Sequence, residues 1–292
     1  MACNNARAAE ADATSKRVRR RWVRSILACV MVAGAILVSW RPVAAQWRNR
    51  PSRSAMTLAT ADSFDGGFQF CRIEFRQASN GDGYGWDVDY PRADQNLSIR
   101  LSELTRTPVT FDDEKEPNHL LLRLDQPELF RCPFIMMTEV GALYLDATEA
   151  DRLRTYLLKG GFLWADDFWG TRAWAIFESQ IRKVFPSSTY PIVDLPLTHP
   201  IFHQVMTVDH VPQIPGFGGG WRVSTSERGA DSAVPHIRGI LDKDGRVMVL
   251  ITFNTDFGDA YEREDQDPDY FRMFSVIGYA FGVNALVYAM TH

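Results

Sequence analysis

Apolar residues in the middle of the chain form short uninterrupted runs, and stretches with helical spacing lie between them. The runs at 120–124, 134–138 and 162–165 are almost wholly apolar, as are strands buried on both faces of a parallel sheet. Two helical stripes accompany them, Ala150, Leu153 and Leu157 and then Trp174, Phe177, Ile181 and Val184. This alternation of strand and helix predicts an α/β fold with a mainly parallel central sheet.

Local signals set the limits of the predicted elements. Asp146 lies three residues before Glu149, which is the spacing of a capping box, and the glycine pair at 160–161 ends the same helix. Outside the middle, the sequence predicts two more strands, at 68–75 and 247–253. It also predicts a short helix at 94–105 and an irregular proline-rich region at 186–215.

The C-terminal segment at 269–291 has helical spacing, and no charged residue occurs between Met273 and Met290. A membrane helix and a buried helix both fit this pattern. Several small or polar residues lower its hydrophobicity: Ser275, Gly278, Gly282 and Asn284. We therefore expect a helix buried against the sheet.

Residues 1–45 have the order of an export signal, with a basic region, an apolar run and a small-residue cleavage site. The apolar run at 26–38 is too short to span a bilayer comfortably. The string RRRWVR at 19–24 is similar to a twin-arginine signal, and a basic leader for the general pathway is the alternative.

We therefore expect a signal peptide at 1–45, a linker at 46–65 and a domain at 66–292 that is exported to the periplasm or cell envelope. If the leader stays uncleaved, it would tether the protein to the membrane instead.

The charge balance changes once the leader is removed. The chain has 32 basic and 36 acidic residues, of which the leader holds eight and two, so residues 46–292 carry a formal charge of −10. An acidic domain lacks the clustered Lys and Arg that nucleic acid binding requires, which excludes nucleic acid as a partner. Cys71 and Cys132 also remain and could be oxidised outside the cytoplasm, but the sequence does not show whether they are bonded.

Several strings of residues are similar to one protein family. The most specific is LRTYLLKGGF at 153–162 followed by Asp166 and Asp167, and the others are WDVDYP at 86–91, ADQNL at 93–97, LF at 129–130, PFI at 133–135, HPIF at 199–202 and NALVYA at 284–289. Over residues 66–292 the chain resembles the bacterial family called domain of unknown function 4159. The resemblance implies a flavodoxin-like, class I glutamine amidotransferase-like three-layer sandwich in envelope proteins without an established activity.

An active glutamine amidotransferase needs a nucleophilic cysteine at a sharp turn after a strand, together with a histidine base. Here the strand at 162–165 continues into Asp166 and Asp167, Cys132 precedes its strand, and Cys71 lies within one. The sequence therefore argues against amidotransferase catalysis. It also lacks the Gly-x-Ser-x-Gly motif of common serine hydrolases.

Acidic residues follow the ends of three predicted strands: Glu139, Asp166 with Asp167, and Asp256 with Asp259 nearby. If these strands are parallel neighbours, their carboxyl ends share the edge of the sheet where open α/β folds bind ligands. Converging carboxylates can share a proton, pair with a base or bind a divalent cation. One hypothesis therefore makes Asp166, Asp167 and Asp256 metal ligands, and the alternative is that these acids cap the following helices.

Two further groups are weaker candidates. Trp86, Asp87 and Asp89 lie in a loop of rings and carboxylates, which can bind sugars or cationic groups but also arises from ordinary packing. The histidines His199, His203 and His210 could bind Zn²⁺, although Pro200 argues against a helix that presents them together. The glycine-rich segment 216–220 lacks the residues of a phosphate loop, and we interpret it as a turn.

Three functions fit these observations. The first is an exported, non-catalytic or degenerate amidotransferase-like module that binds a ligand, an envelope protein or a glycan through the strand-end acids. The second is a divalent-metal-dependent hydrolase with Glu139 or His199 as the base. The third is an interaction module that uses exposed aromatic residues such as Trp169. A divalent metal is the one cofactor that the sequence indicates.

Overall fold

The computed structural model describes residues 56–112, 115–218 and 220–292. The predicted leader lies outside these residues, as does the first half of the predicted linker. Thr57–His292 form a compact unit, which therefore begins within the segment predicted as linker. The backbone N–H of Ala59 donates to the carbonyl of Leu121 at 2.8 Å, so this part of the chain joins the domain.

A seven-stranded sheet organises the unit, with the strand order β3-β1-β4-β6-β9-β8-β7. The strands are β1 (Phe70–Ile73), β3 (His119–Leu122), β4 (Phe134–Thr138), β6 (Phe162–Asp166), β7 (Ile192–Asp194), β8 (His236–Leu241) and β9 (Val247–Phe253). The first five strands in the order run parallel, β8 pairs antiparallel with β9, and β7 pairs antiparallel with β8. Two short strands, β2 (Arg76–Gln77) and β5 (Leu143–Tyr144), form a separate antiparallel pair. The predicted α/β fold with a mainly parallel sheet is confirmed.

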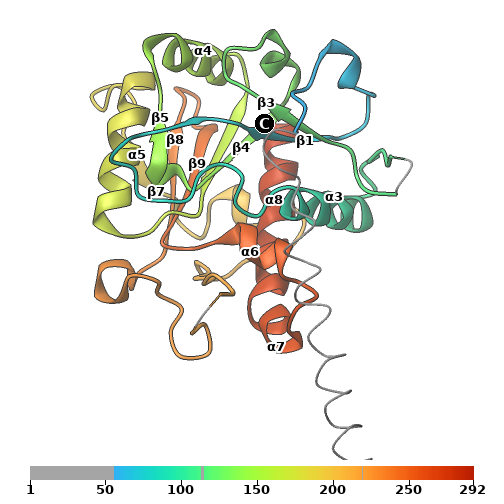
Figure 1. The fold of residues 1–292 in the computed structure, drawn as a ribbon, viewed down its shortest axis with the longest axis vertical. Helices are drawn as coiled ribbons and strands as arrows, with labels where there is room; N and C mark the ends of the chain where they lie inside the picture. The colour runs from blue at the N-terminus through green and yellow to red at the C-terminus, as the bar shows by residue number, and fades with distance from the viewer. Residues whose placement is uncertain (1–55, 113–114, 219) are drawn as a thin grey trace, which may run out of the picture. The chain divides into compact units, whose positions relative to one another are not determined.

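The described residues include six α-helices: α3 (Arg92–Thr105), α4 (Ala147–Leu158), α5 (Gly170–Val184), α6 (Phe257–Glu262), α7 (Pro268–Tyr270) and α8 (Val276–Thr291). Shorter turns are η2 (Ala61–Ser63), η3 (Pro127–Arg131), η4 (Val140–Ala142), η5 (Pro200–Phe202), η6 (Gly229–Ser232) and the π-helical η7 (Phe271–Ser275). Helices α3, α6 and α8 contact one another, and Figure 1 shows α3 and α8 side by side. Helix α4 packs against α5 and contacts β6 and β9.

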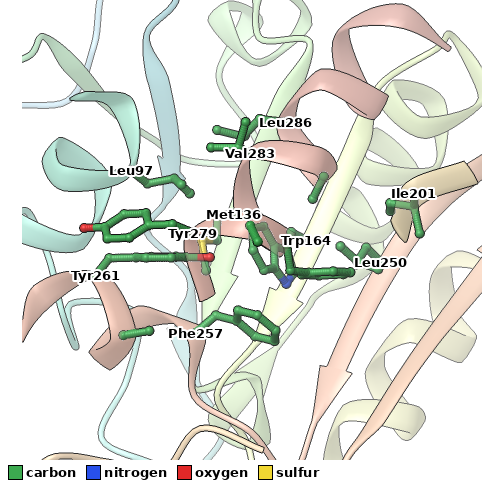
Figure 2. Close-up of a cluster of buried hydrophobic side chains, with 14 of the residues drawn as sticks. Leu97, Met136, Trp164, Ile201, Leu250, Phe257, Tyr261, Tyr279, Val283 and Leu286 are labelled. Carbon is green, nitrogen blue, oxygen red and sulfur yellow. The ribbon is translucent and has the colours of Figure 1, made fainter. Parts of the chain in front are cut away.

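The main core lies between the sheet and the helices α3, α6 and α8. Trp164 on β6 is at its centre, in edge contact with Phe257 at 5.5 Å and Phe281 at 5.9 Å between ring centroids (Figure 2). The Trp164 indole N–H donates to the hydroxyl of Thr252 at 2.8 Å. Because alternate residues of a strand face opposite sides, Trp164 and Asp166 point the same way. The core therefore leads directly to the acidic end of β6.

The C-terminal helix is buried, as predicted. The segment Pro268–Thr291 is long and apolar enough to cross a membrane. However, 67% of an apolar 18-residue stretch within it is buried inside the domain. Asn284 is fully buried and its side chain bonds the backbone of Val205 and Met206. A polar residue with three hydrogen bonds in the core explains why this helix belongs to the domain.

Most predicted elements appear within a few residues of their expected limits, and β4 and β9 match them at both ends. The capping box of Asp146 and Glu149 is present at the start of α4. Cys71 and Cys132 form a disulfide. The bond joins β1 to the residue that directly follows η3, just before β4. β8 was not predicted, and β7 lies within the region predicted to be irregular, so the antiparallel strands of the sheet were not foreseen from the sequence.

Candidate functional site

The strands that end in acidic residues are parallel neighbours, which was the condition for their carboxylates to converge. β4, β6 and β9 lie side by side, and Thr138 at the end of β4 pairs with Asp166 at the end of β6. Four residues around this edge have left-handed backbone conformations: Asp89, Glu139, Asp167 and Asn254. Such conformations are uncommon for residues other than glycine and cluster at functional sites.

Asp166 has a structural position within this edge. One carboxylate oxygen accepts from the Thr252 hydroxyl, and the other accepts from the backbone N–H groups of Phe257 and Gly258, both at 3.1 Å. Asp166 therefore fixes the first turn of α6 to the end of β6. Burial raises the pKa of Asp166 to about 7, against the opposing effect of these hydrogen bonds. Asp166 does not cap α5, the helix that follows its strand, because its oxygens bond the Thr252 hydroxyl and the first turn of α6.

Asp256 and Asp259 lie on the first turn of α6. Asp256 is the N-cap, and its carboxylate accepts from the Asp259 backbone N–H at 2.7 Å. The Asp259 carboxylate accepts from the backbone N–H of Phe217 and pairs with Arg263 at 3.2 Å. The glycine-rich segment that begins at residue 216 therefore passes beside these acids and is anchored to one of them.

Three buried carboxylates meet at the centre of the edge: Asp89, Asp167 and Asp256. One oxygen from each lies within 4.8 Å of the others. The three residues are 2%, 4% and 4% exposed. Among the described residues, no Lys, Arg or His forms an ion pair with any of the three. We call these residues the acidic triad.

Burial and mutual repulsion act together on the triad. Burial raises the pKa of Asp89 well above its ordinary range, and the charges of Asp259 and Glu262 raise it further. Burial likewise raises the pKa of Asp167 and that of Asp256, and each is raised again by neighbouring carboxylates. Like charges that are close together and away from water disfavour ionisation. The triad therefore favours a proton or a cation between its oxygens.

Glu139 and Glu227 lie at the outer margin of the triad. Burial raises the pKa of Glu139 to about 8, and the neighbouring Glu227 raises it as well. Glu227 accepts from the Gly216 backbone N–H at 2.8 Å, and its pKa is raised by lost hydration and by Asp259. Arg228 pairs with Asp82 at 3.1 Å and provides one positive charge at this margin.

The aromatic loop and Trp169 have packing roles. Trp86 is buried and its ring contacts that of Tyr90 at 5.7 Å, while Asp87 is partly exposed. Trp169 was expected to be an exposed contact residue, but it is only 5% exposed because its indole N–H donates to the Asp167 carboxylate at 2.9 Å. This expectation was wrong, since the ring is buried and bonds one member of the triad instead of facing solvent.

The histidines do not join the site. His199 accepts a hydrogen bond from the Ile201 backbone N–H and lies 5.7 Å from the ring of Tyr288. The Tyr288 hydroxyl accepts from Val247, the first residue of β9, whereas Asp256 follows the end of that strand. A seven-residue strand is roughly 20 Å long at about 3.3 Å per residue. His199 therefore lies near the start of β9, at the opposite end of the strands from the acidic triad. The hypothesis that it is a base for this site was wrong. His203 and His210 bond to Leu197 and Asp209 instead.

Several residues that shape the site were not predicted from the sequence. Glu227 and Glu262 contribute charge from irregular or helical positions without a motif. Arg72 on β1 is fully buried and pairs with Asp94 on α3. A charged residue inside an apolar strand was the available signal for Arg72, and no local signal marks the two glutamates.

A comparison with curated proteins finds no significant match. The sequence model of one family matches residues 70–290, which include every strand of the main sheet and all residues of the acidic triad. That family is described as a domain of unknown function. Since the match covers most of the chain, the protein belongs to the family Domain of unknown function (DUF4159).

Proposed function

We propose that this domain is an exported, non-catalytic relative of class I glutamine amidotransferases that binds a positively charged ligand at the acidic end of its sheet. The observation that carries the proposal is the acidic triad, in which three buried carboxylates converge within 4.8 Å. Such a group repels itself unless a positive charge is supplied. Glu139 and Glu227 extend the negative charge toward solvent, where a ligand or partner would first be attracted.

The turn after β6 supports a relationship to the amidotransferases. Asp167 has a φ of 54° and lies between β6 and α5. A sharp strand-to-helix turn is where enzymes with a nucleophile elbow hold their nucleophile. In this chain the position holds an aspartate, and both cysteines that remain after the leader are joined in a disulfide. We therefore propose that the domain shares the architecture of the amidotransferases and lacks their cysteine chemistry.

A divalent-metal-dependent hydrolase is the weaker alternative. Catalysis by a metal ion needs an open position for substrate and water. The triad is at most 4% exposed, and Trp169 covers Asp167. Asp166 already accepts three hydrogen bonds, and His199 lies at the other edge of the sheet. These contacts favour binding over catalysis.

Export is part of the proposal for two reasons. The basic and apolar leader has the order of a signal peptide. The disulfide between Cys71 and Cys132 is a bond that persists in oxidising compartments and is rare in the cytosol. An envelope protein or a glycan with basic groups is the partner class that fits an acidic exported domain, whereas nucleic acid is not.

Thermal unfolding with a panel of cations tests this function. Divalent metals, spermidine, a lysine-rich peptide and an amino-sugar oligomer are added singly to the purified protein, with an uncharged peptide as the control. We expect at least one cation to raise Tm by preferential binding to the folded state. The rise should be smaller in the Asp167→Asn and Glu139→Gln variants. If no cation of any class raises Tm, the acidic edge is not a binding site and the proposal is rejected.

A further inference from the structure

We propose that Asp89, Asp167 and Asp256 together hold one divalent metal ion through carboxylate oxygens. This inference rests on the proposed function, because it names the ligand class for the most buried part of the same site. It changes the ligand set expected from the sequence, since Asp89 replaces Asp166.

The spacing of the triad suits a single ion. One oxygen from each residue lies within 4.8 Å of the others. Calcium binds oxygen ligands at about 2.3–2.6 Å, so two ligands of one ion are at most about 5 Å apart. The three residues come from the loop before α3, the turn after β6 and the N-cap of α6. Only the fold brings these segments together, and it brings their oxygens to coordination range.

Asp89 supplies the second, independent observation. Its Oδ2 atom is buried and has no hydrogen-bond partner. A buried carboxylate oxygen without a partner is costly. The oxygen points at the first turn of α6, because a Cβ atom built on Gly258 would lie 2.1 Å from it. Glycine at 258 is therefore what allows the Asp89 carboxylate to approach Asp256 and the helix terminus.

Neighbouring charges show why the ion belongs on this group. A second group of acids, Asp89 with Asp259 and Glu262, also has oxygens within 4.8 Å. Arg263 already forms ion pairs with two members of that group, with nitrogens 3.2 Å from the Asp259 carboxylate and 2.7 Å from the Glu262 carboxylate. Arg72 is buried nearby, but its Nε and Nη2 atoms donate to Asp94. The triad is the group whose charge no ion pair among the described residues compensates.

The chemistry of the triad selects the class of ion. All candidate ligand atoms are carboxylate oxygens, and neither group contains histidine or cysteine. Oxygen-only sites favour Ca²⁺, Mg²⁺ or Mn²⁺ over Zn²⁺ or copper. The triad is at most 4% exposed, which favours a small ion over a bulky organic cation at this position.

Calorimetric titration of the EDTA-treated protein with Ca²⁺, Mg²⁺ and Mn²⁺, each alone, tests the site. We expect one ion per chain for at least one metal. Asp89→Asn and Asp256→Asn should each weaken its binding at least tenfold. Asparagine is a suitable replacement, since it keeps the size of the side chain and still caps α6 at residue 256. The matched control is Asp244→Asn, which removes an exposed carboxylate paired with Lys243 and should bind the ion as the wild type does. Circular dichroism establishes that each variant is folded.

The outcomes separate the ion site from the proposed function. If spermidine or the lysine-rich peptide binds and no divalent metal does, the ion site is rejected and the acidic binding function stands. If a metal binds Asp89→Asn and Asp256→Asn as tightly as the wild type, the triad is not the site, and this inference is also rejected. If no cation binds at all, both proposals fail.

Discussion

Two groups of buried charge in this domain differ in whether the chain itself supplies the counter-charge. Asp94 is fully buried, and Arg72, also fully buried, bonds both of its carboxylate oxygens. The acidic triad is almost as buried, yet no basic residue among the described parts of the chain forms an ion pair with it. The first group is complete in charge, although Nη1 of Arg72 has no hydrogen-bond partner. The second group is incomplete in charge and fits a ligand from outside. This difference separates a structural charge from a binding site.

Removing the cation of the complete group is the most disruptive way to test the comparison. We expect Arg72→Met to lower the free energy of unfolding by about 3–5 kcal/mol, because it leaves Asp94 buried and unpaired. Denaturant unfolding measures the loss. The double variant Arg72→Met with Asp94→Leu should recover at least half of it, since replacing a whole buried pair is often nearly neutral. A single variant as stable as the wild type would contradict the structural role of the pair.

Supplying a cation to the incomplete group should have the next largest effect. A divalent metal at a hundredfold excess over its Kd should raise the free energy of unfolding by about 2.7 kcal/mol, because it binds the folded state alone. The comparison is denaturant unfolding with the metal and with EDTA. The Asp166→Asn variant serves as a contrast: its stability should fall in both conditions, with the metal increment retained, because Asp166 fixes α6 and is not assigned as a ligand. If Asp166→Asn abolishes the increment, the assignment of ligands is wrong.

Removing one charge from the triad should stabilise the metal-free protein. Asp89→Asn takes away a carboxylate whose pKa is raised by burial and by neighbouring acids. We expect Asp89→Asn to be more stable than the wild type in EDTA, because asparagine has the size of aspartate but adds no carboxylate to a buried acidic group. The exposed Asp244→Asn variant should change stability by less than about 0.5 kcal/mol. A loss of stability in Asp89→Asn without metal would show that the carboxylate is already compensated.

The smallest expected effect is a change of stability with pH in EDTA. The pKa of Glu139 is raised from 4.5 to about 8 and that of Asp166 from 3.8 to about 7. Between pH 6.5 and 8 the folded protein holds protons that the unfolded chain has released, so stability must fall as pH rises. The histidines His199 and His236 have lowered pKa values and are neutral in this range.

We expect Tm to fall by several degrees between pH 6.5 and 8.5, at about 1.4 kcal/mol per proton and pH unit and roughly 2–4 °C per kcal/mol. Glu139→Gln should reduce the slope. Saturating divalent metal should flatten or reverse it, because metal binding requires ionised carboxylates. A Tm that rises with pH in EDTA would contradict the raised pKa values of these residues.

The strands and helices around the site were predictable where their signals are local. β4 and β9 are uninterrupted apolar runs, and α4 begins with a capping box and ends before a glycine pair. Such patterns depend on neighbouring residues alone. β7 and β8 were less visible because they form the antiparallel edge of the sheet. Residues of β8 such as His236 and Arg238 are polar and partly exposed there.

The candidate site was predicted in outline, and its ligand set was not. The sequence placed acids after three strands, and the strand order made them neighbours. Asp166 and Asp167 are adjacent in the chain, yet they have different positions because successive residues of a strand end face opposite directions. Asp166 meets α6, whereas Asp167 turns toward Asp89 and Asp256. Asp89 lies 78 residues before Asp167, and no pattern in the sequence links the two.

The sequence by itself determined the α/β class, most element limits, the acidic charge of the domain and the presence of acids at strand ends, because each depends on local patterns or on composition. The tertiary structure decided which of those acids are neutralised. Three such contacts join distant segments of the chain. Arg72 pairs with Asp94, and Asp166 accepts hydrogen bonds from α6. Asp89 approaches Asp256 because residue 258 is a glycine. Ionisation is set by burial and by charges a few ångströms away, and packing alone fixes both.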